Sequence, residues 1–252
     1  NPKKSITTTA TKDGAVWRLD SERTVESTYD GKGNALTQDI TIKTAVLDKN
    51  NNLPEVTLDP TTKALPAIPA AQFEESEKQH IVNTGFTAKG NPKKSITTTA
   101  TKDGAVWRLD SERTVESTYD GKGNALTQDI TIRTAVLVGN DLPEVTPDPK
   151  TGALPPIPAA NFEDSEKQHI VNTGFTAKGN PKKSVTTSAT MDGGVWKLDS
   201  ERTVESTYDG KGNALTQDIT IRTAILVNDQ LPAATVDAVT GVLKDIGAAK
   251  FE

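Results

Sequence analysis

The sequence has no cysteine, two histidines, one methionine and few aromatic residues, which supply 4% of its 252 positions. The absence of cysteine excludes disulfides, thiolate metal sites and a thiol nucleophile. With so few histidines and aromatics, we expect no cofactor and no resident metal. No apolar run approaches the roughly 18 residues of a membrane-spanning helix, so we expect no membrane insertion. Residue 1 is Asn rather than Met, and we expect any leader to lie outside the sequence.

Positively charged residues are fewer than negatively charged ones. The chain has 29 Lys and Arg against 34 Asp and Glu, a net charge of −5. Because nucleic acids and anionic membranes attract basic surfaces, we expect the protein to bind neither. Threonine, by contrast, is abundant: it supplies 37 residues. Threonine favours β-strands, so the composition already points toward a β-rich chain.

One segment occurs three times. Residues 1–42 recur unchanged at 91–132 and return with a few replacements at 180–221. Tandem repeats of this kind decide how the rest of the chain is read. We therefore divide the chain into three repeat bodies and two nearly identical 16-residue segments between them, which we call joiners. The bodies are 1–74, 91–163 and 180–252, and the joiners are 75–90 and 164–179.

Alternation of polar and apolar residues with period two predicts strands, and no segment predicts a long helix. In the first body we expect strands over 5–12, 15–29 and 34–47, with tight turns between them. The polar run 20–23 should either break the second strand in two or mark a bulge. The segment 53–73 carries four prolines and should cross between sheets as short edge strands and extended chain.

The alternation also predicts which side chains are buried together. Trp17, Leu19, Val25 and Tyr29 fall on odd positions and should share one face of their strand. Each repeat then offers about five to seven strands, a number that fits a small sandwich of immunoglobulin-like size. We therefore predict an all-β chain of three tandem antiparallel β-sandwich repeats, in which the joiners act as completing strands.

Three bodies share only two joiners. If each body needs a joiner strand to complete a sheet, one body keeps an unpaired edge. A neighbouring chain could supply that strand, which would give a head-to-tail homo-oligomer or filament. The joiner residues expected to carry this pairing are His80, Ile81, Val82 and Phe86, with His169, Ile170, Val171 and Phe175. Three alternatives stay open. The chain could be a piece of a longer array, so that its open edge only reflects where the piece was cut. The joiners could lie outside the bodies as ordered connectors, or the three bodies could close around a pseudo-threefold axis.

Candidates for catalysis are weak. Both histidines lie in the joiners, and the third repeat has none. Asp20 and Glu22 have the spacing of a carboxylate pair on one strand face, as glycoside hydrolysis would need. The adjacent Arg23 favours ordinary charged surface residues instead. The Asp-Gly-Lys-Gly-Asn segments, which superficially resemble calcium loops, have Lys at a ligand position and read as turns. We therefore expect that the protein is not an enzyme.

The tryptophans support a second hypothesis. If Trp17, Trp107 and Trp196 are buried, they anchor the core; if they are exposed on a sheet, they could stack on sugar rings. Their alternation with Leu19 and its copies favours the core. A multivalent carbohydrate- or ligand-binding module, with one weak tryptophan site per repeat and a surface glycan as partner, is nevertheless the alternative function.

Threonine-rich, cysteine-free tandem β repeats resemble bacterial surface and virion structural proteins as a broad category. We therefore predict a non-enzymatic structural protein with an adhesive, self-assembling role. It would be a component of an extracellular fibre, a cell-surface array or a virion, and would assemble through β-strand pairing between repeats or chains.

Overall fold

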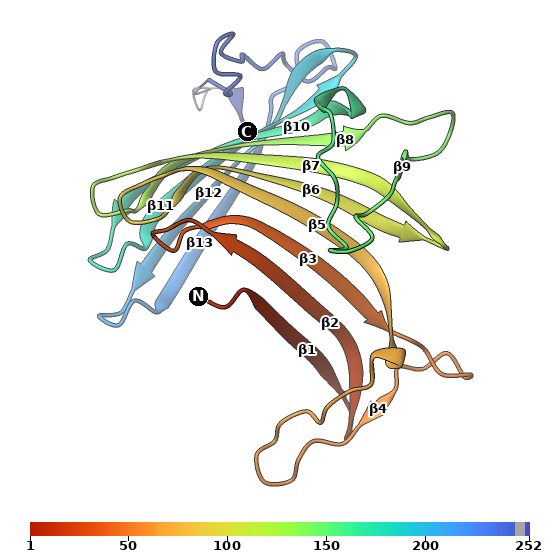
Figure 1. Cartoon of the computed structure of the whole chain (residues 1–252). Coiled ribbons are helices and arrows are strands. Elements are labelled where there is room, and N and C mark those ends of the chain that lie inside the picture. Colours follow the sequence, from red (N-terminus) through yellow and green to blue (C-terminus); the bar gives the residue numbers. More distant parts are fainter. Residues whose placement is uncertain (245–249) are drawn as a thin grey trace. The chain divides into compact units, whose positions relative to one another are not determined.

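The computed structural model describes residues 1–244 and 250–252, and these are almost entirely strands and loops (Figure 1). The first repeat contains β1 (Lys4–Asp13), β2 (Val16–Tyr29), β3 (Ala35–Ala45) and β4 (Glu55–Val56), followed by η1 (Ala70–Gln72) and the joiner strand β5 (Phe73–Phe86). The second contains β6 (Pro92–Asp103), β7 (Val106–Tyr119), β8 (Ala125–Ala135) and β9 (Glu144–Val145), followed by η2 (Ala159–Asn161) and the joiner strand β10 (Phe162–Phe175). The third contains β11 (Pro181–Asp192), β12 (Val195–Tyr208) and β13 (Ala214–Thr223). The all-β prediction is confirmed. Within the described residues, no helix is long and apolar enough to cross a membrane.

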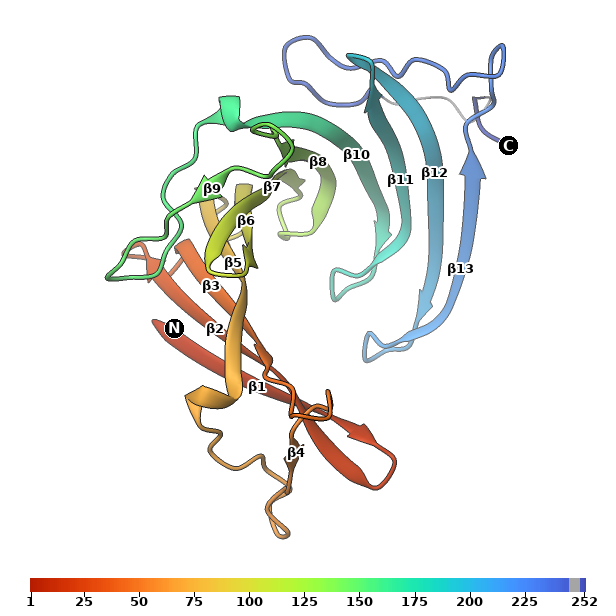
Figure 2. The same cartoon turned by 90° about the vertical axis from the view of Figure 1, so that its right-hand side faces the viewer.

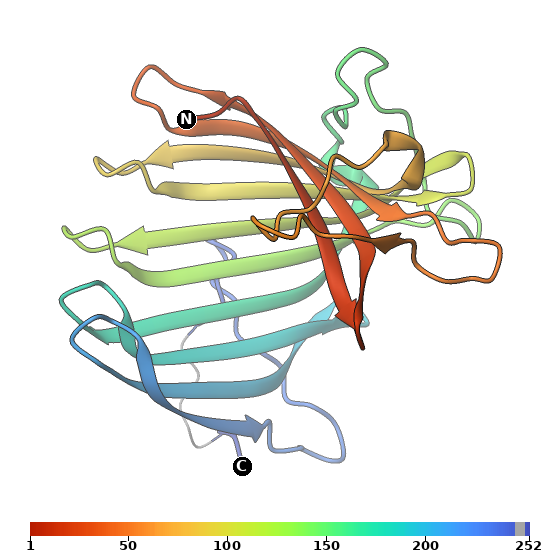
Figure 3. The same cartoon turned by 90° about the horizontal axis from the view of Figure 1, so that it is seen from below.

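The strands belong to one antiparallel sheet. Its order is β1-β2-β3-β5-β6-β7-β8-β10-β11-β12-β13, and the two short strands β4 and β9 pair with β2 and β7 (Figure 3). The chain divides into two compact units. The first comprises Asn1–Val82, Thr97–Ser111 and Ala135–Pro158, and the second comprises Asn83–Ile96, Glu112–Thr134 and Ala159–Glu252.

The predicted sandwich in each repeat is not confirmed. Each repeat contributes its long strands to a common sheet instead of folding two sheets face to face. The sequence could not distinguish the two, because a half-buried strand alternates in the same way in a sandwich and in a single sheet. What differs is strand length: β2 runs for 14 residues, whereas strands in globular proteins are usually about 3–10 residues long.

The polar run in the middle of β2 is a bulge. The pairing of β2 with β1 skips Asp20, which is an extra residue in β2. Leu19 pairs with Ala10, and Val25 pairs with Ser5, five positions away on β1. Because strand residues alternate between faces, Leu19 and Val25 point to opposite sides of the sheet. The prediction that they share one face was therefore wrong, and the bulge is the reason.

A small core lies beside each bulge, under the proline-rich loop of the repeat. Leu19, Leu109 and Leu198 are at most 1% exposed. The backbone N–H of each donates a 2.8 Å hydrogen bond to the carbonyl of a loop proline. In the first repeat the buried cluster consists of Leu19, Ala45 and Phe73, packed against Leu53, Val56 and Ile68. The loop that carries β4 and η1 thus folds back onto its own sheet (Figure 2) and does not cross to a second one.

The predicted turns are present. The carboxylate of Asp30 accepts the backbone N–H of Lys32 at 2.8 Å and of Asn34 at 2.9 Å. These hydrogen bonds, the one from Asn34 first, lower the pKa of Asp30. Asp120 and Asp209 make the same contacts in the other repeats. The turn interpretation of the Asp-Gly-Lys-Gly-Asn segments is therefore confirmed.

Candidate assembly surface

Both joiners are strands within the sheet. The sheet order places β5 between β3 and β6, and β10 between β8 and β11. His80, Ile81 and Val82 lie opposite Asp39, Gln38 and Thr37 of β3, and Phe86 ends β5. His169, Ile170, Val171 and Phe175 lie opposite Thr187, Thr186, Val185 and Pro181 of β11. All eight predicted joiner residues are thus strand residues, while their role between chains stays a prediction.

A histidine–aspartate pair connects each joiner to the strand before it. The Nδ1 atom of His80 lies 2.7 Å from Oδ1 of Asp39. The copy is equally close, with Nδ1 of His169 at 2.6 Å from Oδ1 of Asp129. A hydrogen bond to a carboxylate is stronger than one between neutral groups, so these pairs help to hold the joiners in register.

Two further contacts repeat beside the histidine. Nζ of Lys78 lies 3.3 Å from Oγ1 of Thr41, and the hydroxyl of Ser76 donates to the carbonyl of Ile42 at 3.2 Å. Ser76 is an extra residue where the pairing of β3 and β5 shifts register. The corresponding contacts of the second joiner are Lys167 to Thr131 at 3.2 Å and Ser165 to Ile132 at 2.9 Å.

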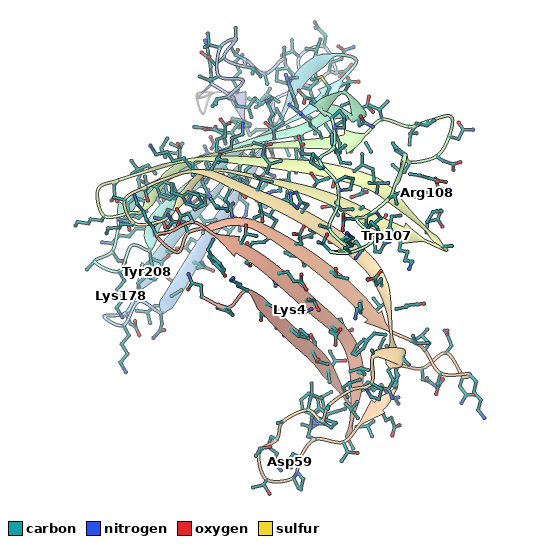
Figure 4. The ribbon with its side chains drawn as sticks, viewed as in Figure 1. Lys4, Asp59, Trp107, Arg108, Lys178 and Tyr208 are labelled. Carbon is teal, nitrogen blue, oxygen red and sulfur yellow. The ribbon has the colours of Figure 1, made fainter. Side chains whose placement is uncertain are left out.

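The lysine of each joiner also reaches the tryptophan of the following repeat. Nζ of Lys78 lies 5.1 Å from the ring centre of Trp107, which is labelled on β7 in Figure 4. Nζ of Lys167 lies at the same distance from the ring centre of Trp196. Both lysines are less than 10% exposed. Burial lowers the pKa of Lys167, and the negative charge of Asp164 acts against that shift.

The three tryptophans are not equivalent. Trp107 is 9% exposed and belongs to a buried cluster with Ala100, Val145 and Leu154. Trp17 and Trp196 are half-buried. In the described part of the chain, no cation lies over the ring of Trp17. The ligand-binding alternative at these residues stays a prediction.

A loop of the following repeat covers the joiner lysine. Gly152 has φ of +71°, and a Cβ added there would lie 3.4 Å from Nζ of Lys78. Gly241 has the same φ, and its Cβ would lie 3.8 Å from Nζ of Lys167. The position that aligns with these glycines in the first repeat is Lys63, with φ of +60°. Glycine therefore stands where a joiner lysine is covered, and lysine where none is.

The same hollow occurs in the second and third repeats with different walls. The hollow on β8 is about 350 Å³ and is lined by Asp129, Thr131 and Arg133, by the joiner residues Asp164 and Lys167, and by loop residues 240–242. The hollow on β13 is about 320 Å³ and is lined by the matching residues Asp218, Thr220 and Arg222, with side chains of β11 and β12. The hollow of the third repeat is thus lined by the same strand positions as the hollow of the second repeat, but by no joiner residue and no loop residue.

The missing wall leaves β13 open. Every residue of β13 is exposed. Ile219 is 51% exposed, whereas Ile40 and Ile130 at the same position in the other repeats are 3% and 6% exposed. At the opposite edge of the sheet, Ile6 on β1 is 57% exposed. Unpaired edges of this kind can pair with another strand.

The residues weighed for catalysis have structural partners. Glu22 forms a 2.9 Å ion pair with Lys43, and Asp20 accepts a hydrogen bond from Ser21 at the bulge. Among the residues described, no group of three or more His, Cys, Asp and Glu side chains could hold a metal ion. The sequence reasoning overlooked the contacts of Lys78 and its copy, although their identical placement in both joiners was a visible signal.

No protein-family model matches the chain, and no curated protein matches it. Among solved structures, the chain is similar to a protein of unknown function from Bacteroides fragilis, with 10% identity over 71% of this chain and 89% of that chain, and a TM-score of 0.33. It is also similar to a porin-like protein from Bacteroides uniformis, with 10% identity over 87% of this chain and 96% of that chain, and a TM-score of 0.15. Likenesses this low carry no argument about fold or function.

Proposed function

We propose that the chain is a non-enzymatic structural protein that joins molecules by strand pairing at the open edges of its sheet. In this proposal it is a component of an extracellular fibre, a cell-surface array or a virion. The observation that supports it most is the exposure of Ile219, at 51% against 3% and 6% for its two copies. Within the described residues β13 pairs along its length with β12 alone, and an edge strand with an exposed apolar side chain favours pairing with a further strand.

The internal junctions show what such pairing supplies. The contacts of a joiner with the strand before it, and with the tryptophan after it, are repeated nearly unchanged at both junctions. Between molecules β13 would meet β1 with no joiner strand between them, so that contact would depend on backbone pairing of the two edge strands. A head-to-tail order would place the β13 edge of one molecule at the β1 edge of the next and give an open-ended oligomer or filament.

Sedimentation velocity and negative-stain electron microscopy of the full chain at rising concentration test this function. We expect the wild-type protein to form larger species as its concentration rises. Ile219→Lys should suppress them, because a lysine on an edge strand opposes pairing. Val239→Lys is the matched control, since Val239 is a 94% exposed apolar side chain outside the edge strands. A wild-type protein that stays monomeric throughout, or equal effects of both variants, would contradict the proposal.

A second variant tests the head-to-tail order. Ile6→Lys changes the β1 edge and leaves β13 intact. If molecules join head to tail, Ile6→Lys should suppress association as strongly as Ile219→Lys does. If association depends on Ile219 alone, β13 pairs with β13, and the head-to-tail order is wrong.

A further inference from the structure

Charge is distributed unevenly over the second compact unit. Four of its hairpin turns lie at one end of the sheet (Figure 3): 87–91, 120–124, 176–180 and 209–213. Together with the four residues on either side of each turn, they hold eight lysines and four acidic residues. This end, which we call the lysine rim, therefore has a net charge of +4, whereas the chain as a whole has −5.

The four acidic residues of the rim already have partners. Glu116 and Glu205 form ion pairs with rim lysines at 2.7 and 2.9 Å. Asp120 and Asp209 accept hydrogen bonds within their own turns. No carboxylate of the described residues pairs with the other six rim lysines, all of which are exposed. These six are Lys89, Lys93, Lys122, Lys178, Lys182 and Lys211.

Glycines hold two of these lysines against a neighbouring turn. Nζ of Lys89 donates to the carbonyl of Lys122, and its stem crosses Gly123, where an added Cβ would lie 2.9 Å from Cδ of Lys89. Gly123 has φ of +87°, so a side chain there would be strained as well as crowded. Lys178, labelled in Figure 4, and Gly212 repeat this arrangement. Because these ammonium groups are already positioned, a ligand loses little free energy to ordering them.

Two further rim lysines lie against glycines of the adjacent strand. A Cβ added at Gly85 would lie 3.4 Å from Cβ of Lys93, and one at Gly174 would lie at the same distance from Cβ of Lys182. Glycine at these positions lets the lysine stem lie on the backbone while its ammonium stays in water. The rim thus presents a repeated pattern of charge.

The turns are spaced so that their charges act together. The sheet order β5-β6-β7-β8-β10-β11-β12-β13 makes the four turns successive hairpins. Neighbouring strands are about 4.8 Å apart, so successive turns are about 10 Å apart and all four span about 30 Å. The Debye length at physiological ionic strength is about 8 Å. A small anion is therefore attracted by one turn, whereas an extended polyanion contacts several turns at once.

The other residues of the rim distinguish among polyanions. Every cation of the rim is lysine and none is arginine, so the rim lacks the planar fork that binds phosphate through two hydrogen bonds. The four turns contain no aromatic residue, whereas single-stranded nucleic acids are bound by stacking on exposed rings. Their largest apolar side chain is that of alanine, which is too small to anchor a protein in a bilayer. Lysines among small polar residues suit a hydrated polymer of charged sugars.

We propose that the lysine rim binds a linear anionic polysaccharide that lies across successive turns. Each lysine that contacts a charged group of the polymer releases counterions, so the affinity falls as the salt concentration rises. The net charge of −5 does not oppose this binding, because the excess negative charge lies outside the rim. The inference goes beyond the proposed function, since it depends on side-chain charge and not on strand pairing.

The test follows the fluorescence anisotropy of fluorescein-labelled dextran sulfate with the full chain, and uncharged dextran is the matched probe. We expect saturable binding of dextran sulfate that weakens as salt rises, and no binding of dextran. The rim variant combines four substitutions: Lys93→Gln, Lys122→Gln, Lys182→Gln and Lys211→Gln. The control variant combines four at exposed lysines outside the rim: Lys12→Gln, Lys49→Gln, Lys63→Gln and Lys150→Gln.

The two variants lose the same number of charges at different places. The rim variant should bind dextran sulfate at least tenfold more weakly than the wild type, with a smaller dependence on salt, and the control variant should bind as the wild type does. Equal losses in both variants would mean that affinity follows net charge alone, and would overturn the inference. Absence of binding by the wild type at physiological ionic strength would overturn it too.

Hydrogen exchange of the wild type gives a second readout that needs no variant. We expect dextran sulfate to protect amides of the four rim turns and not those of loop 48–52; protection confined to other segments would contradict the inference. A labelled single-stranded oligonucleotide and vesicles containing phosphatidylglycerol complete the test. If either binds the chain more tightly than dextran sulfate does at equal salt, the rim belongs to that partner and the polysaccharide assignment is wrong.

Discussion

The stack of Lys167 on Trp196 allows a direct measurement of how a joiner is held by the repeat after it. Nζ lies 5.1 Å from the ring centre, and Lys167 is 9% exposed. The first junction, where Lys78 lies over Trp107, has an added complication, since Lys102 also lies over that ring, at 5.5 Å. The third repeat has Met191 at the position of Lys102. The perturbation is therefore Lys167→Met, which keeps the apolar stem and removes the charge, combined with Trp196→Leu.

The expected coupling follows from the burial of the lysine. Cation–π contacts contribute about 0.5–1 kcal/mol at exposed sites and about 2 kcal/mol when desolvated. Because Lys167 is nearly buried, we expect a coupling of about 1.5 kcal/mol. Urea denaturation of the wild type, the two single variants and the double variant gives this value as the departure from additivity. Lys167→Met alone can raise or lower the free energy of unfolding, because it removes a buried charge together with the contacts of that charge.

The first repeat supplies the matched control. Lys12 lies opposite Trp17 in the sheet, but its ammonium does not lie over the ring. Lys12→Met combined with Trp17→Leu should therefore be additive within about 0.5 kcal/mol. A coupling below about 0.5 kcal/mol for Lys167 and Trp196, or an equal coupling for both pairs, would refute the reasoning.

Two further outcomes are expected. Leu109→Ala should lower the free energy of unfolding in urea by about 3–5 kcal/mol, because the side chain is 1% exposed. Ile219→Ala on the open edge should change it by less than about 0.5 kcal/mol, and similar losses for both would be inconsistent with the burial difference. The lowered pKa of Lys167 means that the unfolded chain binds more protons between the folded pKa and 10.5. In that range the stability of the wild type relative to Lys167→Met should rise with pH in urea denaturation, and a flat or falling difference would count against it.

Local alternation predicted the strands well, because it depends only on which residues face the core. The strands over 5–12 and 34–47 are present with small changes at their ends. The bulge in β2 was foreseen as one of two outcomes, but its effect on Leu19 and Val25 was not. A single extra residue moves every later side chain of the strand to the opposite face of the sheet. Where that extra residue falls depends on the pairing with the partner strand.

The number of sheets could not be predicted from the same pattern. Pairing of β5 with β3 joins residues 28 to 45 positions apart, and no local preference encodes such a choice. The candidate surface was foreseen in part, since the joiner histidines were singled out from the count of repeats. The lysines two positions before them, Lys78 and Lys167, were passed over because a charged residue on a strand is usually solvent-exposed. The loop carrying Gly152 and the ring of Trp107 approach Lys78 from the following repeat and help to bury it.

The loop position occupied by Lys63, Gly152 and Gly241 limits how far this loop can vary. A Cβ at Gly152 would lie 3.4 Å from Nζ of Lys78, whereas the ammonium of Lys63 donates to the carbonyl of Pro60 in its own loop. A longer side chain at Gly152 would therefore crowd a nearly buried lysine, so this position can vary freely only in a repeat whose loop covers no lysine.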